Sequence, residues 1–142
     1  MKRFIGFAIV LVTLFISGSA FAEDLTFEVN GKKYEAAKQD LYGYNTWKDA
    51  KAACEGSVEL YAFYKGWSLP SIDELNAMYE QLHKKGVGGF ADYYYWSSSE
   101  RDEDNVWVKH FSLSLEANET SNFSGKWEYP YSTFRARCVR AL

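Results

Sequence analysis

Serines and histidines are the side chains of this sequence that could form a hydrolytic site. The run Ser97-Ser98-Ser99 offers three hydroxyls, and His83 or His110 could be the base that activates one of them. A hydrolase nucleophile usually lies on a strained turn with the pattern Gly-x-Ser-x-Gly. The stretch 66–70 (Gly-Trp-Ser-Leu-Pro) misses this pattern at its last position. We therefore expect the serines to bond backbone groups at strand ends and turns, the histidines to lie on the surface, and no residue to be catalytic.

Aromatic rings are concentrated in the segment Tyr93-Tyr94-Tyr95-Trp96. Because side chains alternate along a strand, Tyr93 and Tyr95 project to one side and Tyr94 and Trp96 to the other. If Trp96 is in the core, Tyr93 and Tyr95 face outward, where flat rings with a polar tip stack on sugars or anchor a protein partner. Packing of these rings beneath a polar loop at 116–126 is the equally favoured alternative.

Charged side chains form two further candidate binding groups. Arg135 and Arg137 share one face of an expected last strand and could grip a carboxylate or sulfate, although pairing with the nearby acidic turn is favoured. The turn 100–104 (Glu-Arg-Asp-Glu-Asp) could hold Ca²⁺ through its carboxylates, but it lacks EF-hand spacing, and we interpret it as a solvated turn. The candidate ligand-binding residues are Tyr93, Tyr95, Arg101, Asp102, Asp104, Arg135 and Arg137.

The first 22 residues have the pattern of a secretory signal peptide. Lys2 and Arg3 form a short cationic start, and residues 4–16 are an apolar run too short to span a membrane. Ala20-Phe21-Ala22 is the small-x-small pattern that signal peptidase cleaves. No cysteine follows this site and no paired arginines begin the chain, so we expect Sec export to the periplasm or the extracellular space, without a membrane anchor. Residues 23–142 then form one domain.

Charge and aromatic content exclude two classes of protein. Loss of residues 1–22 takes the formal net charge from −3 to −5, because that segment carries two basic residues and no acidic one. Nucleic-acid binding depends on clustered basic residues that neutralise phosphates, so we expect no nucleic-acid partner. The chain contains 5 Trp, 11 Tyr and 10 Phe, whereas disordered chains are poor in such residues. We expect a folded domain with either an aromatic core or an aromatic binding surface.

Cys54 and Cys138 are the two cysteines of the chain. In an exported protein, two cysteines most simply form one structural disulfide. The alternatives are a reactive thiol or a metal ligand, but a metal site needs further ligands, and the sequence has neither Cys-x-x-Cys nor His-x-x-x-His spacing. We expect the disulfide, no metal and no cofactor.

Turn and capping signals place the first half of the fold. Asn30-Gly31 lies between the strand-like runs 25–29 and 32–35, which predicts a β-hairpin with a type I′ turn. Thr46 is the expected cap of a first helix that ends near Gly56. The side chains that share its buried face are Trp47, Ala50 and Cys54.

A capping box predicts the second helix, since Ser71 and Glu74 have the required types and spacing. Its apolar stripe is Ile72, Leu75, Met78 or Tyr79, and Leu82, and Lys84-Lys85-Gly86 ends it. Strands are expected at 93–98, 106–113 and 133–140, with the polar loop at 116–126 between the last two. A hairpin, two helices and then antiparallel strands indicate an α+β fold.

Several short blocks occur in an order that resembles a known bacterial family. The blocks are Trp47-Lys48-Asp49-Ala50 with Cys54, residues 66–75, residues 95–100, Trp107 with Phe111-Ser112, and Arg137-Cys138-Val139-Arg140. Over roughly residues 41–140 this set resembles the C-terminal domain of the Legionella collagen-like adhesin, and it is similar to the Fibrobacter major paralogous domain. Ser68 departs from the arginine that the family usually carries in its Gly-Trp-Arg-Leu-Pro block.

The resemblance implies a C-type-lectin-like fold, related to the formylglycine-generating enzyme group, with two helices packed on antiparallel sheets. The calcium-dependent sugar site of true C-type lectins uses Glu-Pro-Asn or Gln-Pro-Asp and Trp-Asn-Asp blocks. Here the prolines lie in 69–71 (Leu-Pro-Ser) and 129–131 (Tyr-Pro-Tyr), so that site is not expected. The tryptophans within family blocks are expected in the core; they are Trp47, Trp67, Trp96 and Trp107.

These observations favour a non-catalytic binding module that recognises a carbohydrate or protein ligand at the cell envelope or surface. We expect the ligand to contact the aromatic and polar surface near residues 93–104. One alternative is a diverged formylglycine-generating-like enzyme, which needs a reactive cysteine pair. Another is a structural or assembly subunit without a small ligand.

Overall fold

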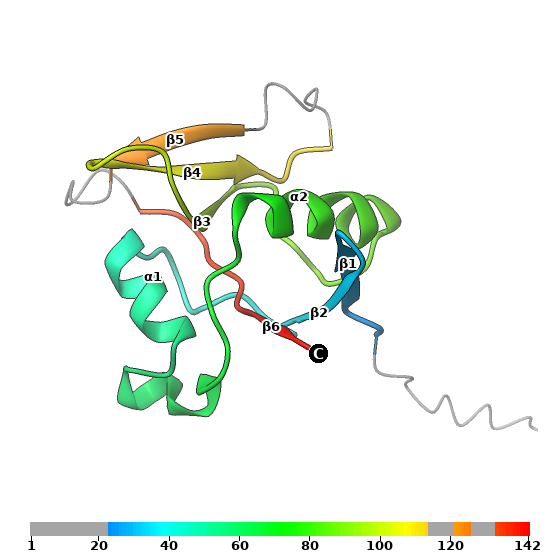
Figure 1. The fold of residues 1–142 in the computed structure, drawn as a ribbon, viewed down its shortest axis with the longest axis horizontal. Coiled ribbons are helices and arrows are strands. Elements are labelled where there is room, and N and C mark those ends of the chain that lie inside the picture. The colour runs from blue at the N-terminus through cyan, green and yellow to red at the C-terminus, as the bar shows by residue number, and fades with distance from the viewer. Residues whose placement is uncertain (1–22, 114–120, 126–132) are drawn as a thin grey trace, which may run out of the picture.

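The computed structural model describes residues 23–113, 121–125 and 133–142, so the expected signal peptide at 1–22 lies outside the described residues. The described chain has the predicted α+β architecture, with two antiparallel sheets of order β1-β2-β6 and β3-β4-β5. The helix α2 (Ile72–Gln81) contacts β1 of the first sheet and β3 and β4 of the second, and Figure 1 shows it between them. No helix in the described ranges combines the length and apolar composition needed to span a membrane.

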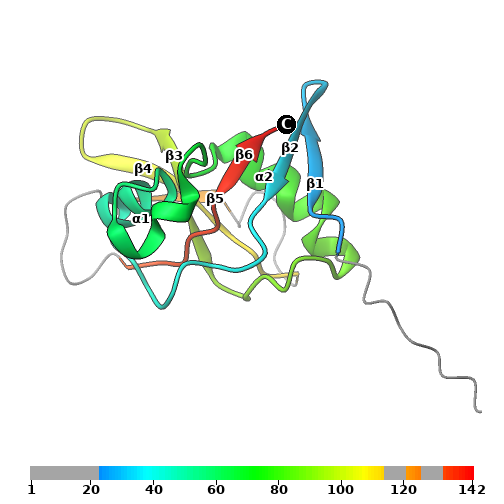
Figure 2. The same ribbon diagram turned by 90° about the horizontal axis from the view of Figure 1, so that it is seen from below.

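The first sheet contains the predicted N-terminal hairpin, formed by β1 (Thr26–Val29) and β2 (Lys32–Ala36). Asn30 and Gly31 have φ values of 50° and 79°, and a type I′ turn requires positive φ at both positions. The strand β6 (Val139–Ala141) pairs with β2, so the end of the chain lies beside the N-terminal hairpin (Figure 2).

A glutamine side chain covers the outer edge of β1. The Glu28 N–H donates to Gln81 Oε1 at 2.9 Å, and Gln81 Nε2 donates to the Glu28 carbonyl at 2.7 Å. The amide of Gln81 therefore pairs with Glu28 as a neighbouring strand would.

Both predicted helices and their caps are confirmed. In α1 (Trp47–Cys54) the Asp49 N–H donates to Thr46 Oγ1 at 3.3 Å, and the buried face includes Trp47, Ala50 and Cys54. In α2 the capping box is complete, because the Glu74 N–H donates to Ser71 Oγ at 3.1 Å and the Ser71 N–H donates to Glu74 Oε2 at 2.6 Å. The short 3-10 helix η2 (His83–Lys85) follows, and Gly86 ends it with a φ of 73°.

The second sheet consists of β3 (Tyr94–Glu100), β4 (Asn105–His110) and β5 (Ser121–Gly125). The prediction of a loop over 116–126 is wrong for residues 121–125, since they pair antiparallel with β4. Their polar sequence, Ser-Asn-Phe-Ser-Gly, lacks the alternation of apolar residues that would have indicated a strand. The other residues of that loop, 116–120 and 126, lie outside the described residues.

The predicted last strand at 133–140 is also corrected, because regular pairing is confined to β6. Upstream of it, Phe134 and Arg135 make isolated bridges to Asn45 and Tyr95. This segment therefore runs from the second sheet to the first, and each stretch of it pairs with a different partner.

The core contains the predicted disulfide, which joins Cys54 and Cys138. Trp47 and Trp96 are buried beside it, and their indole N–H groups donate to the Ser97 and Asn45 carbonyls at 2.9 and 2.7 Å. Trp67 and Trp107 are only half-buried, which corrects the expectation that they lie in the core. Trp107 alternates along β4 with the buried Val106 and Val108, so its ring is on the opposite face.

Candidate functional site

A cleft of about 640 Å³ opens beside the 3-10 helix η1 (Glu59–Tyr64). The residues 35–42 and Arg140 line it together with η1 and Trp67. Its aromatic lining consists of Tyr42, Tyr61, Phe63, Tyr64 and Trp67. Its charged and amide lining consists of Glu35, Lys38, Gln39, Asp40 and Arg140. Apolar walls with a few polar groups, at this volume, are typical of sites that bind small molecules.

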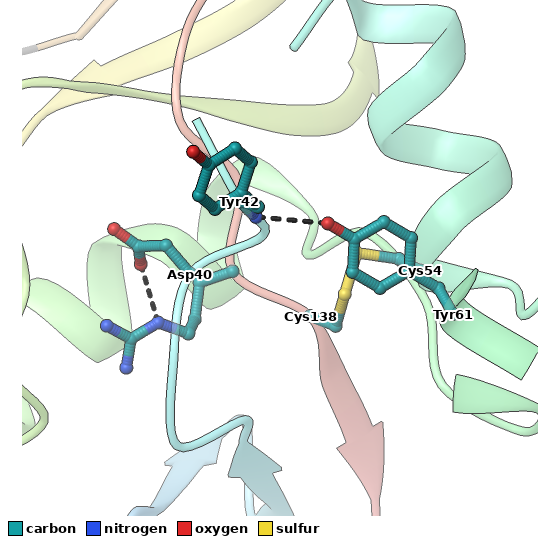
Figure 3. The surroundings of a disulfide bond; sticks show 6 residues. Asp40, Tyr42, Cys54, Tyr61 and Cys138 are labelled. Atoms are coloured by element: carbon teal, nitrogen blue, oxygen red, sulfur yellow. Dashed lines mark hydrogen bonds and ion pairs between the residues drawn. A yellow bond between two sulfur atoms is a disulfide. The ribbon is translucent and has the colours of Figure 1, made fainter. Parts of the chain in front are cut away.

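The disulfide joins the two walls of this aromatic cleft. Cys54 is the last residue of α1, which leads into η1, whereas Cys138 directly precedes β6, which carries Arg140. Figure 3 shows this bridge with Tyr42 and Tyr61 joined by a hydrogen bond nearby. The position of η1 relative to Arg140 is therefore supported by a covalent bond.

Gly56 allows the chain to turn from α1 into η1. Its φ is 72°, and a Cβ at this position would lie 2.6 Å from the backbone nitrogen of Lys65. Only glycine fits such a close approach at positive φ without displacement of the backbone. The loop that carries the aromatic residues of η1 is thus closed tightly at its base.

The helix η1 presents unusually large apolar side chains to the surface. No residue of η1 is buried, and Leu60 and Phe63 are 72% and 70% exposed. The helix consists of short turns that meet at Tyr61, whose φ of −114° and ψ of 21° are not helical. Exposed apolar side chains gathered in one place are typical of a binding surface.

Trp67 is held between an aromatic ring and a guanidinium group. Its ring centroid lies 5.4 Å from that of Tyr64 in an edge-on arrangement, and the Arg140 guanidinium lies 4.6 Å from the Trp67 ring. Arg140 in turn forms an ion pair with Glu35, with 2.6 Å between Nη2 and Oε2. These contacts fix the orientation of the half-exposed indole.

Tyrosines provide hydroxyl groups on the walls of the cleft. The Tyr42 N–H donates to the Tyr61 hydroxyl at 3.1 Å, which links residues 35–42 to η1. The Tyr42 ring itself is 91% exposed. Burial raises the pKa of the Tyr64 phenol, so this hydroxyl keeps its proton at neutral pH and can donate a hydrogen bond.

Two of the predicted ligand-binding residues, Tyr93 and Arg135, are half-exposed around Tyr44. The Tyr93 ring centroid lies 5.1 Å from that of Tyr44, and the Arg135 guanidinium lies 5.2 Å from the same ring. Neither residue lines the aromatic cleft. The structure therefore brings these two together, at a place separate from the cleft.

The expectation that Tyr95 and Arg137 face a ligand is wrong, because both side chains are buried. Tyr95 has no exposed area, and its hydroxyl donates to Asp40 Oδ2 and accepts from the Ala91 N–H, each at 2.8 Å. Arg137 is 1% exposed and its Nε donates to Asp40 Oδ1 at 2.7 Å. The pairing favoured for the arginines does occur, but with Asp40 and not with the 100–104 turn.

The other three predicted residues, Arg101, Asp102 and Asp104, lie in the connection between β3 and β4. Asp102 Oδ1 accepts from the N–H groups of Asp104 and Asn105 at 2.9 and 2.8 Å, so this carboxylate closes its own turn. Hydrogen bonds, first from the Asn105 side chain and also from the backbone, lower the Asp102 pKa. Arg101 lies 5.8 Å from the Trp107 ring. Among the described residues, no group of three or more metal-ligating side chains comes together.

The serines bond backbone groups as predicted. Ser97 Oγ donates to the Trp107 carbonyl at 2.5 Å, and the Ile72 N–H donates to Ser99 Oγ at 2.9 Å. The histidines are half-buried and not surface residues as expected: His83 Nε2 donates to the Phe111 carbonyl at 2.6 Å, and His110 Nδ1 accepts from the Ser112 N–H at 3.0 Å. Each histidine also packs against aromatic rings.

Neither a protein-family model nor a curated protein sequence matches the chain. The resemblance of its motif blocks to the adhesin-domain family therefore stays a prediction.

The residues of the aromatic cleft were not predicted from the sequence as a site. Tyr61, Phe63 and Tyr64 belong to a run, Leu60-Tyr61-Ala62-Phe63-Tyr64, that has neither the alternation of a strand nor the stripe of a helix. The aromatic excess and the absence of periodicity in this run are the signals that would have indicated exposed rings.

Proposed function

We propose that this protein is an exported, non-catalytic binding module that binds a carbohydrate in its aromatic cleft, in the periplasm or at the cell surface. In this proposal the chain has the C-type-lectin-like fold of the adhesin-domain family that its motif blocks resemble. The disulfide supports export, because such bonds persist in oxidising compartments.

The arrangement around Trp67 is the observation that carries the proposal. A sugar ring has an apolar C–H face and a rim of hydroxyls, so it suits a half-exposed aromatic ring with charged and amide groups close by. Trp67 provides the ring, and Glu35, Gln39 and Arg140 line the same cleft as hydrogen-bonding groups. The contacts of Trp67 with Tyr64 and Arg140 hold the ring before a ligand arrives, which lowers the entropic cost of binding.

A thiol-based modifying enzyme is less well supported. Such an enzyme needs a reactive thiolate, whereas Cys54 and Cys138, the two cysteines of the sequence, are joined to each other. The hydroxyls of Ser97 and Ser99 are engaged with backbone groups.

A glycan array with the purified protein tests the proposal, followed by titration of the best ligand. We expect Trp67→Ala to weaken binding by about tenfold or more, the usual cost of a central aromatic contact. Tyr42→Ala should weaken it less, and because Tyr42 is 91% exposed this variant should fold normally. Tyr44→Ala is the matched control, since Tyr44 is an exposed tyrosine that does not line the cleft. An array without binding, or an equal loss in Tyr44→Ala, would contradict the carbohydrate proposal.

A protein ligand is the second candidate, favoured by the exposure of Leu60 and Phe63. Apolar anchors of this kind dominate binding energy in protein interfaces. In this case the glycan array stays silent, and a partner captured from envelope extracts by the wild-type protein is lost with Leu60→Ser or Phe63→Ser. Retention of that partner by both variants would exclude this surface.

A further inference from the structure

A second pocket, of about 740 Å³, shares part of its lining with the aromatic cleft. Lys38, Gln39, Asp40 and Tyr42 line both cavities. In the second pocket the remaining lining includes the glycine loop at 86–89, Glu23, Arg135 and Arg137. Tyr42 is the aromatic residue in this lining, and the rest consists largely of charged side chains and backbone. The pocket therefore suits a charged ligand.

Arg137 forms the inner part of this pocket and its hydrogen bonds are made within the protein. Its Nε donates to Asp40 Oδ1 at 2.7 Å, and its Nη1 donates to the carbonyls of Ala37 and Gly88 at 3.0 and 2.7 Å. We assign it a positioning role, because it orients the glycine loop against the segment that carries Asp40.

Arg135 differs from Arg137 in that its guanidinium is poorly satisfied. Its Nε is shielded from water and has no hydrogen-bond partner among the described residues. Its Nη1 lies 3.5 Å from Asp40 Oδ2, which already accepts a hydrogen bond from Tyr95 at 2.8 Å. A buried polar group without a partner is rare and costly in native proteins. Asp40 thus serves two guanidinium groups, and the side chain of Arg135, which is 31% exposed, is the one that a ligand in the pocket can reach.

A carboxylate from the same chain already reaches the edge of this pocket. The Gly88 N–H donates to Glu23 Oε2 at 3.2 Å. Glu23 is exposed, so a competing carboxylate can displace it at low cost.

We propose that the second pocket binds the carboxylate group of a small organic acid, with Arg135 as the main contact, and that Glu23 competes for the same place. Guanidinium and carboxylate groups match in charge and in planar geometry. This site does not depend on carbohydrate binding in the aromatic cleft.

The wild-type protein itself allows the test, because the buried Arg135 Nε–H group is a specific NMR reporter. We expect acetate, glucuronate and N-acetylalanine to shift this signal and the Gly88 amide signal saturably at constant ionic strength, whereas glucose and chloride do not. Glucuronate stands for a sugar acid and N-acetylalanine for a peptide carboxyl end, so their relative affinities identify the source of the carboxylate. Absence of saturable shifts with all three acids, or equal shifts with chloride, would overturn the proposal.

Three variants assign the roles of the residues. Arg135→Lys keeps the positive charge but loses the planar pair of N–H donors that can bind both oxygens of a carboxylate. We expect about tenfold weaker binding. Glu23→Gln should bind more tightly, by a few-fold, because the competitor is gone. Arg101→Lys is the matched control, since Arg101 lines neither cavity, and its affinity should equal that of the wild type. Equal affinities in Arg135→Lys and the wild type would remove Arg135 from the site.

Discussion

At the scale of single residues, Asp40 is a nearly buried carboxylate that three other side chains contact. Its side chain is 10% exposed and contacts Arg135, Arg137 and the Tyr95 hydroxyl. In Figure 3 its carboxylate points away from Tyr61. A buried carboxylate requires such partners, because an unpaired charge in the interior is strongly unfavourable.

Tyr95→Phe should destabilise the protein by about 1–3 kcal/mol at neutral pH, since it leaves Asp40 Oδ2 and the Ala91 N–H without their shared partner. Burial, and then the negative charge of Asp40, raises the pKa of Tyr95. Below pH 10 the phenol keeps its proton in both states and contributes no pH dependence. Above pH 10 the unfolded chain releases this proton and the folded chain retains it, so stability falls by up to about 1.4 kcal/mol per pH unit.

Urea unfolding of the wild type and Tyr95→Phe, at neutral pH and in steps above pH 10, measures both effects. The difference in the free energy of unfolding should narrow as the pH rises, because the phenyl ring of the variant cannot ionise. Tyr42→Phe, at an exposed hydroxyl, should stay within about 0.5 kcal/mol of the wild type at neutral pH. A constant gap between wild type and Tyr95→Phe at all pH values would argue against a raised pKa.

The roles of single residues were predictable from the sequence where the signal was local or followed from the number of residues of one type. The two cysteines could pair only with each other, and Ser71 and Glu74 form a cap whose partners lie within one turn. The exposure of Tyr95 was not predictable, because alternation along β3 gives an outward face only when one side of the sheet meets solvent. Here Tyr95 and Trp96 pack into different core clusters, so both sides are covered.

At the scale of elements, the turn from α1 into η1 sets the position of the aromatic residues Tyr61, Phe63 and Tyr64. At Gly56 the two ends of this turn lie close together, since a Cβ there would be 2.6 Å from the backbone nitrogen of Lys65. A displacement there moves the whole of η1 relative to Trp67.

Gly56→Ala should destabilise the protein by about 2 kcal/mol or more, since it combines positive φ with a clash against backbone. Gly43→Ala is the matched control: its φ is 69° and a Cβ there meets no atom within 4 Å, so only the backbone strain of about 1 kcal/mol applies. Thermal unfolding of both variants measures the difference. Equal losses would show that the contact with Lys65 does not restrain η1.

Elements with their own turn and capping signals were predicted correctly, as the hairpin, α1 and α2 show. The strand β5 was not, because its polar sequence lacks the alternation of a strand, and the short β6 was not, because its pairing depends on β2, which is distant in the sequence. The helix η1 was missed for a different reason. Its large side chains stay exposed, so it has no apolar stripe from which a helix could be inferred.

At the scale of the whole molecule, one disulfide connects segments that are 84 residues apart. A loop of this length makes the chain-entropy contribution of the bond about 4–5 kcal/mol. Because small domains are stable by only about 5–15 kcal/mol in total, loss of the bond should bring the protein close to unfolding.

Cys54→Ser combined with Cys138→Ser should lower the free energy of unfolding by about 4–5 kcal/mol, as measured by urea denaturation. The same experiment on the reduced wild-type protein separates the bond from the substitutions. If reduction changes the stability by less than about 1 kcal/mol, the noncovalent contacts of α1 and β6 suffice to hold the two walls of the cleft.

The pair of hydrogen bonds between Gln81 and Glu28 has a consequence for how copies of this protein behave at high concentration. An open strand edge is a template for another chain and a common start of aggregation. Here the outward backbone groups of Glu28 are already taken by a side-chain amide from α2. The edge of β1 is therefore blocked at Glu28, and a rise in protein concentration does not offer these two groups to a neighbouring molecule.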